Sequence, residues 1–186
     1  MRKYLAECFG TGILVFFGCG SVIFCVDGVS SFYISIVFGL AFLTSYLFIG
    51  KISGSHINPA VSFAMYLEKK ISLKEFFLYC LWQILGSIIA CLFLVVIVLQ
   101  CADLGLGSLA SACNGFSANS LTGAILGFAF IVECLITACF VFSYLFFTSK
   151  KNFAPYAAFA IRFLLLLLFL LCQYLFCKLL LFRFFR

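Results

Sequence analysis

The sequence Ser53-Gly54-Ser55-His56-Ile57-Asn58-Pro59-Ala60-Val61-Ser62 decides the fold of this chain, because it opens a short helix between two long apolar stretches. Asparagine followed by proline is a helix-start signal: asparagine caps free N–H groups, and proline fits the first helical position. The predicted helix, residues 59–67, is apolar except for Ser62. At about 1.5 Å per residue it is about 13 Å long, near half of a hydrocarbon core about 30 Å thick.

Two interpretations of this short helix stay open at the level of sequence. A re-entrant half-helix would dip into the membrane, where irregular backbone is tolerated only if it lines a cavity or is buried in protein. The alternative is an amphipathic helix that lies on the cytoplasmic surface.

The composition places the rest of the chain in a membrane. Of the 186 residues, 66% are hydrophobic and 10% are charged, whereas about half of a soluble domain is apolar. Apolar stretches long enough to span a bilayer lie at about 5–26, 32–49, 76–100, 121–147 and 153–176. We therefore predict an all-α membrane protein, and we expect the first stretch to stay as a transmembrane helix because it lacks a cleavage site.

The basic residues predict the orientation. Arg2, Lys3 and the connections at residues 50–74 and 148–152 carry Lys or Arg, while the connections at residues 27–31 and 100–120 carry none. The positive-inside rule then places the N-terminus in the cytoplasm of a multi-pass protein of the plasma or inner membrane. Because the basic residues lie in these short flanks, we predict no nucleic-acid partner despite the net charge of +6.

The 11 cysteines do not predict a metal centre. Most of them lie inside apolar stretches, where cysteine behaves as a small hydrophobic residue. No Cys-x-x-Cys pair occurs and His56 is the only histidine, so we predict neither a metal site nor a cofactor. Cys101 and Cys113 share one polar connection, and the sequence leaves open whether they pair in an oxidising compartment.

An internal repeat relates the first apolar stretch to the fourth. The pattern Glu-Cys-x-x-Thr-x-x-x-Val-Phe begins at Glu7 and recurs at Glu133, an offset of 126. The two copies are an odd number of spans apart, so they must face opposite ways, as in channels and transporters built from inverted repeats. Because a carboxylate inside a span is costly and generally functional, we expect both residues to accept hydrogen bonds from N–H groups of non-helical loops. Direct ion or proton carriage is the alternative.

These motifs together resemble the aquaporin family, also called the major intrinsic proteins, over about residues 1–161. The pattern Ser-Gly-x-His-x-Asn-Pro-Ala-Val between two spans is highly specific, whereas a lone Asn-Pro-Ala is weak. Further matches are Ala6-Glu7-x-x-Gly10-Thr11, Phe17-Gly18-Cys19-Gly20, Gln83, Gly86, Glu133 and Phe153-Ala154-Pro155. The resemblance implies six spans and two half-helices that meet at mid-membrane, with about five of the six spans recognisable here. It also implies a homotetramer with one pore per subunit.

The resemblance also implies a set of pore residues. Asn58, with Pro59 and Ala60, would offer side-chain N–H donors to a passing water or small neutral solute, and the positive end of the half-helix dipole would repel cations. The exposed carbonyls of Gly54, Ser55, His56 and Ile57 would supply acceptors. Phe38 occupies a position that in the family belongs to the selectivity ring, where phenylalanine resembles the water-selective members. The alternative is an ordinary core- or lipid-facing side chain.

The last residues depart from the family pattern. The repeat offset would place a second box near position 184, where the sequence reads Phe184-Phe185-Arg186, and no second Asn-Pro-Ala occurs. We interpret 1–161 as an incomplete aquaporin-like channel domain and 162–186 as an atypical Leu/Phe-rich tail, introduced by a frameshift or premature stop. A native tail with a new role is the alternative.

The function that the resemblance implies is therefore a passive, water-selective channel, and the sequence leaves open whether the truncated chain conducts. The alternatives are a facilitator of glycerol or another small neutral solute, a non-conducting membrane subunit, and a secondary transporter with a broken helix. An enzyme is not predicted, because the sequence holds no catalytic set of Ser, His and Asp, no metal cluster and no phosphate loop.

Overall fold

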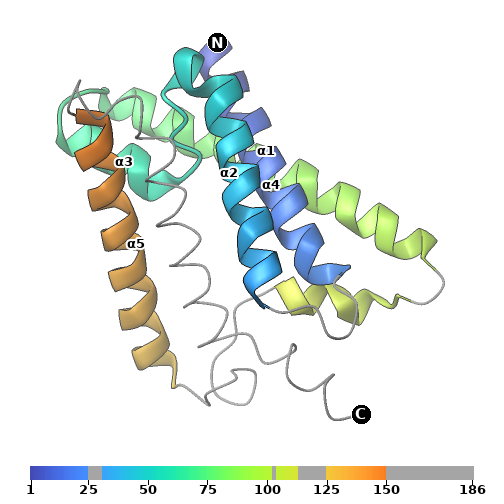
Figure 1. Ribbon diagram of the computed structural model, residues 1–186. Helices are drawn as coiled ribbons and strands as arrows, with labels where there is room; N and C mark the ends of the chain where they lie inside the picture. Colours follow the sequence, from blue (N-terminus) through green and yellow to red (C-terminus); the bar gives the residue numbers. More distant parts are fainter. Residues whose placement is uncertain (25–30, 102–103, 113–124, 150–186) are drawn as a thin grey trace.

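The computed structural model describes residues 1–24, 31–101, 104–112 and 125–149, and every regular element in these ranges is a helix (Figure 1). The elements are α1 (Arg2–Ile23), α2 (Ser31–Ser53), α3 (Pro59–Leu67), α4 (Leu73–Gln100), the 3-10 helix η1 (Leu106–Ala112) and α5 (Leu126–Ser149). Within the described ranges, α1, α2, α4 and α5 are long and apolar enough to cross a membrane. The predicted all-α membrane fold is confirmed, and the predicted span at 153–176 lies outside the described residues.

The helix ends differ from the ends of the apolar stretches. α3 begins and ends at the predicted residues, whereas α1 and α4 begin three residues earlier than predicted and α5 begins five residues later. In α4 the cause is a capping box before the apolar stretch. The Ser72 hydroxyl accepts a hydrogen bond from the Glu75 N–H, and the Glu75 carboxylate accepts one from the Ser72 N–H. This reciprocal cap satisfies two free N–H groups and lets the helix start in polar sequence.

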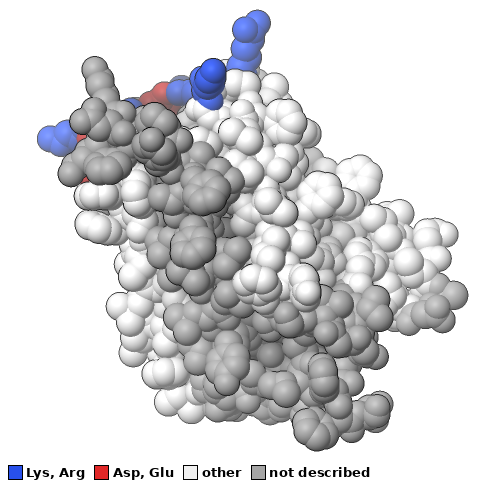
Figure 2. Space-filling view, in the orientation of Figure 1, with Lys and Arg blue, Asp and Glu red and all other residues white. Residues whose placement is uncertain are grey.

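The starts of α1 and α4 and the end of α2 lie at one end of the molecule. Lys3 in the first turn of α1 forms an ion pair with Glu75 in the first turn of α4. The Tyr79 hydroxyl of α4 donates a hydrogen bond of 2.7 Å to the carbonyl of Ser53, the last residue of α2. Hence α1 and α4 run parallel and α2 runs against both. Figure 2 shows Lys and Arg side chains gathered at this end, which we call the basic end; its described members are Arg2, Lys3, Lys51, Lys69, Lys70 and Lys74.

Glycines let α1 approach its two neighbours closely. A Cβ added to Gly86 of α4 would overlap the carbonyl oxygen of Cys8 in α1, and one added to Gly18 of α1 would overlap the Phe38 ring of α2. Without a strong hydrophobic force between helices in lipid, such close packing by small residues holds membrane helices together.

The short helix α3 reaches the interior of the bundle. The hydroxyl of Ser62, in its first turn, accepts a hydrogen bond of 3.2 Å from the side-chain amide of Gln83. Gln83 lies ten residues into α4, about 15 Å along the helix from the basic end. Val61 and Ser62 are fully buried. α3 is therefore a re-entrant half-helix, and the interpretation as a surface helix is wrong.

α5 runs in the opposite direction to α1, as the inverted repeat predicts. The hydroxyl of Tyr144, near the end of α5, donates to the carbonyl of Gly54, which follows directly on α2 at the basic end. One turn earlier, the Phe140 ring packs edge-on against Phe42 of α2 at a centroid distance of 5.8 Å. α5 thus ends at the end of the molecule where α1 begins.

Candidate functional site

The loop between α2 and α3, residues 54–58, is built around the carboxylate of Glu7. This side chain is fully buried, and it accepts four hydrogen bonds. One oxygen accepts from the backbone N–H of His56 (2.9 Å) and the hydroxyl of Ser53 (2.6 Å). The other accepts from the backbone N–H of Ile57 (2.7 Å) and the amide of Gln83 (2.9 Å). The carboxylate thus satisfies donors of a non-helical loop that water cannot reach.

The same bonds fix the direction of the loop carbonyls. In a trans peptide the C=O of one residue points opposite to the N–H of the next, and no cis peptide occurs in the described residues. Because the N–H groups of His56 and Ile57 point at Glu7, the carbonyls of Ser55 and His56 point away from it. Within the described part of the chain, no hydrogen bond is made to the carbonyls of Ser55, His56 or Ile57.

Two tyrosines hold the start of the loop by its carbonyl groups. Tyr79 donates to the Ser53 carbonyl and Tyr144 donates to the Gly54 carbonyl, each at 2.7 Å. One of the four carbonyls predicted to serve as acceptors, that of Gly54, therefore already accepts a hydrogen bond from the protein. Buried tyrosine hydroxyls generally find such a partner.

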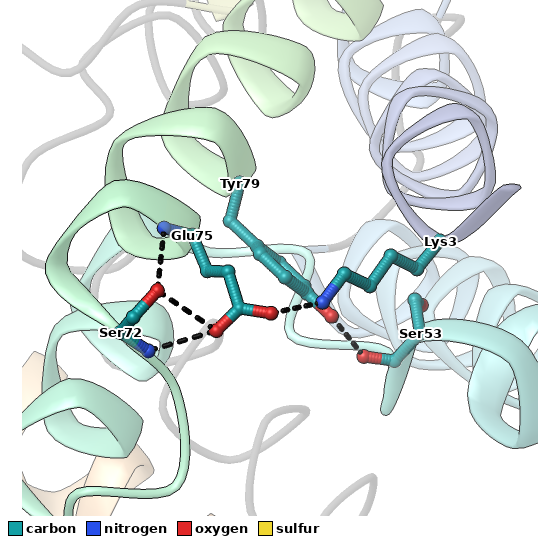
Figure 3. A network of polar contacts seen from close by, with 5 residues as sticks. All are labelled: Lys3, Ser53, Ser72, Glu75 and Tyr79. Atoms are coloured by element: carbon teal, nitrogen blue, oxygen red, sulfur yellow. Dashed lines mark hydrogen bonds and ion pairs between the residues drawn. The ribbon is translucent and has the colours of Figure 1, made fainter. Parts of the chain in front are cut away.

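Figure 3 shows how the basic end is connected to this loop. The Lys3 ammonium pairs with Glu75, and Glu75 in turn completes the cap with Ser72. The ammonium also lies 5.8 Å from the ring centroid of Tyr79, whose hydroxyl reaches Ser53. The start of α1, the start of α4 and the end of α2 are thus linked through side chains of α1 and α4 and the backbone carbonyl of Ser53.

The His56 side chain points into the protein and not along the loop. Its ring is 3% exposed, stacks on Tyr79 at a centroid distance of 4.5 Å, and meets the Tyr144 ring edge-on. Its Nδ1 atom lies 3.1 Å from the hydroxyl of Ser62 in α3. His56 therefore joins the loop to the first turn of the half-helix through its side chain.

Asn58 caps α3 in a way that leaves its amide donors available. Its side-chain oxygen accepts a hydrogen bond of 2.8 Å from the N–H of Ala60. The reverse orientation of the amide would bring two donors together, so the NH₂ group must point away from the helix. Asn58 and Ala60 are half-buried, and Pro59 is exposed in the described structure.

A model of the family described as "Major intrinsic protein" matches residues 1–177. This chain belongs to the major intrinsic protein family. Two relatives are named Aquaporin Z. That of Photorhabdus laumondii is 35% identical over 164 residues, covering 84% of this chain and 71% of the relative. That of Brucella melitensis is 36% identical over 167 residues, covering 88% and 72%.

A solved structure also matches the fold of this major intrinsic protein. The X-ray structure of the aquaglyceroporin from Plasmodium falciparum aligns with a TM-score of 0.74 at 21% identity, covering 95% of this chain and 74% of that one. At this identity the likeness shows the fold alone. The family members are channels and not enzymes, and they are integral membrane proteins that pass water or small solutes.

The structure places the two remaining predicted residues of this family member away from the loop. Phe38 is buried in α2 beside Val22 and Ile34, fifteen residues before the end of that helix, with its ring against Gly18. Glu133 is half-buried on α5, and the position that the repeat offset assigns to its loop, near residue 184, lies outside the described residues. Cys101 is a free cysteine in the structure, and Cys113, with which the sequence left a pairing open, lies outside the described residues. In the described ranges, no group of three His, Cys, Asp or Glu side chains could hold a metal ion.

Sequence reasoning did not assign a role to several residues of this site. Tyr79, Tyr144 and Ser53 contact the loop or its anchor directly, and Gln83 bridges Glu7 to Ser62. One signal was available, because polar atoms in an apolar span need a partner inside the protein. That signal names the residues that need a partner but does not identify the partner.

Proposed function

We propose that this chain forms a passive pore for water, in which Asn58 and the carbonyls of residues 55–57 contact the solute. The observation that carries the proposal is that the protein uses the N–H groups of the loop and the oxygen of the Asn58 amide, and leaves the loop carbonyls and the Asn58 NH₂ group. The cap uses the oxygen of the Asn58 amide and leaves its NH₂ group, while Glu7 draws the loop N–H groups to one side and leaves the carbonyls on the other. A row of carbonyl acceptors that leads to the NH₂ donor of Asn58 suits a small molecule, such as water, that both donates and accepts hydrogen bonds.

The proposed mechanism needs no covalent step. A water molecule that accepts from the Asn58 amide at the N-terminus of α3 is oriented by that bond, so it cannot pass a proton along a chain of waters. The positive end of the α3 dipole repels cations at the same point. The loop carbonyls accept hydrogen bonds from the water molecule, and these bonds replace those that it gives up on leaving bulk solvent.

Water is favoured over glycerol by two observations. Relatives at 35% and 36% identity carry the name aquaporin, and the residue that the family resemblance assigns to the selectivity position, Phe38, is a phenylalanine, which resembles the water-selective members. We propose that its ring narrows the pore on the side away from the basic end. Glycerol or another small neutral solute is the second candidate.

The proposal also covers the orientation of the chain in the membrane and its assembly. We propose that the basic end faces the cytoplasm, because the Lys and Arg residues of the described helices gather there. The N-terminus then lies inside the cell. Family membership supports a homotetramer with one pore in each subunit.

Permeability of proteoliposomes tests the proposal. Stopped-flow light scattering after a sucrose shock reports water flux, and isotonic glycerol uptake reports glycerol flux. The decisive variant is Asn58→Asp, since aspartate caps a helix as well as asparagine does but offers no NH₂ group. We expect it to lower water flux to near that of empty liposomes, while Glu68→Gln at the exposed end of α3 leaves the flux unchanged.

The outcomes separate the candidates. Flux of the unaltered chain equal to that of empty liposomes would overturn the pore and support a non-conducting subunit. Asn58→Asp conducting like the unaltered chain would overturn the role of the amide. Phe38→Ala should raise glycerol flux relative to water flux, and an unchanged ratio would remove Phe38 from the selectivity region.

A further inference from the structure

A groove of about 450 Å³ lies between α1 and α4. Its walls come from Leu5, Phe9 and Phe16 on α1 and from Ile89 and Phe93 on α4, and its lining is almost wholly apolar. Leu5, Phe9, Ile89 and Phe93 are each about half exposed or more. The groove is therefore open to the outside of the described bundle, and its volume is typical of a site that holds a small molecule.

Small residues at the helix crossing create the groove. Gly12 of α1 and Gly86 of α4 both line it. A Cβ on Gly12 would lie 3.5 Å from the Gly86 carbonyl oxygen, and one on Gly86 would overlap the Cys8 carbonyl. The backbones thus meet with no side chain between them, while the larger side chains on either side rise as walls. The result is an elongated apolar groove along the outside of the two helices.

A cation lies on the groove face at the basic end. Arg2 precedes Leu5 by three residues and Phe9 by seven, the spacing that puts helical residues on one face. Arg2 is exposed, and among the described residues the ion pairs are Lys3–Glu75 and Lys70–Glu68, so Arg2 belongs to neither. Lys3 is directed elsewhere, toward Glu75 and the Tyr79 ring.

We propose that the groove binds one acyl chain of an anionic phospholipid whose phosphate contacts Arg2. The groove supplies an apolar surface for the acyl chain, and Arg2 supplies a positive charge at the end where the lipid headgroups lie. Anionic lipids are attracted to basic residues beside a span by about 1 kcal/mol for each Lys or Arg, which is about a fivefold preference over a lipid without net charge. The charge at one end of an otherwise apolar groove favours a lipid over a second copy of this chain.

The single tryptophan reports on this site. Trp82 is the only tryptophan in the 186 residues. It does not line the groove, but it lies four residues before the lining residue Gly86, the spacing that puts both on one face of α4. Bromine atoms on an acyl chain quench tryptophan fluorescence at short range. The full chain is reconstituted in bilayers with brominated phosphatidylglycerol diluted in phosphatidylcholine, and then with the bromine on the phosphatidylcholine instead. We expect phosphatidylglycerol to be preferred over phosphatidylcholine beside Trp82 about fivefold, once the share of each lipid in the bilayer is divided out.

Matched variants distinguish the contribution of the Arg2 charge to lipid binding from the contribution of the apolar groove. Arg2→Gln should remove the preference, while Lys51→Gln, an exposed charge at the same end on α2, should keep it. Ile89→Phe fills the groove and should reduce quenching by both lipids. Ile88→Phe is the control, because Ile88 is as exposed as its neighbour (49% and 48%) but does not line the groove.

Three results would overturn the proposal. Quenching by each brominated lipid in proportion to its share of the bilayer would show that the headgroup is not selected. A preference that survives Arg2→Gln would remove the contact with that residue. Weak quenching by both lipids that rises as the protein is diluted would show that a second copy covers the groove. None of these readouts depends on permeability, so the test stands apart from the pore.

Discussion

Glutamine at position 7 has almost the shape of glutamate, but it has only one side-chain oxygen, so it has half of the capacity to accept hydrogen bonds. In the structure all four neighbours of the Glu7 carboxylate donate: two backbone N–H groups of the loop, the Ser53 hydroxyl and the Gln83 amide. In Glu7→Gln one oxygen becomes an NH₂ group, which faces two of these donors. The variant therefore loses two hydrogen bonds whichever way the amide turns.

The expected cost follows from the type of bond. Hydrogen bonds to a charged group contribute about 1.5–3 kcal/mol each, so two of them are worth about 3–6 kcal/mol. The Ser53 hydroxyl can recover about 1 kcal/mol through the Ile49 carbonyl, which lies 3.3 Å away. We expect Glu7→Gln to lower the free energy of unfolding by about 2–5 kcal/mol.

The measurement is unfolding by SDS in mixed micelles, followed by far-ultraviolet circular dichroism. Glu68→Gln is the matched control, because the Glu68 side chain is 48% exposed and pairs with Lys70 at 3.3 Å. An exposed pair of this kind contributes about 0–1 kcal/mol. A loss for Glu7→Gln no larger than that of the control would refute the reasoning, since the loop would then not depend on an ionised anchor.

Two further variants test the packing around the loop and between the helices. Tyr144→Phe removes the hydroxyl that donates to the Gly54 carbonyl, so we expect a loss of about 1 kcal/mol in the same SDS titration; a loss as large as that of Glu7→Gln would contradict this ranking. Gly86→Ala would press a methyl group into the Cys8 carbonyl and should cost about 1–3 kcal/mol. Its control, Gly127→Ala in the first turn of α5, meets nothing within 4 Å and should change the stability by no more than about 0.5 kcal/mol; equal effects of the two changes would argue against the close crossing.

The half-helix could be predicted to the residue because its signals are local. Asn58 and Pro59 fix the start of α3, and its last residue, Leu67, directly precedes the charged segment 68–70. The ends of the long helices were predicted less well, because hydropathy marks where a chain becomes apolar and not where a helix begins. The capping box at Ser72 starts α4 before its apolar stretch.

The partners of the buried polar groups could not be predicted from spacing. The bond from Tyr79 to the Ser53 carbonyl joins positions 26 apart in sequence, and the bond from Tyr144 to the Gly54 carbonyl joins positions 90 apart. Such pairs depend on how α4 and α5 pack around the loop. The cost of a buried carboxylate did predict that Glu7 would need donors, but the contributions of Ser53 and Gln83 required the structure.

The loop backbone links this anchoring to the proposed pore. Ser55 and Ile57 have φ values of +57° and +52°, in a region that is a genuine outlier for a β-branched residue. Each such residue costs on the order of 1–3 kcal/mol and persists only where its surroundings determine it. Backbone of this kind directs successive N–H groups to one side and makes a concavity for an anion, and the Glu7 carboxylate occupies it. Since each trans peptide then turns its carbonyl to the other side, the strain and the buried charge together produce the row of carbonyls on which the proposed pore depends.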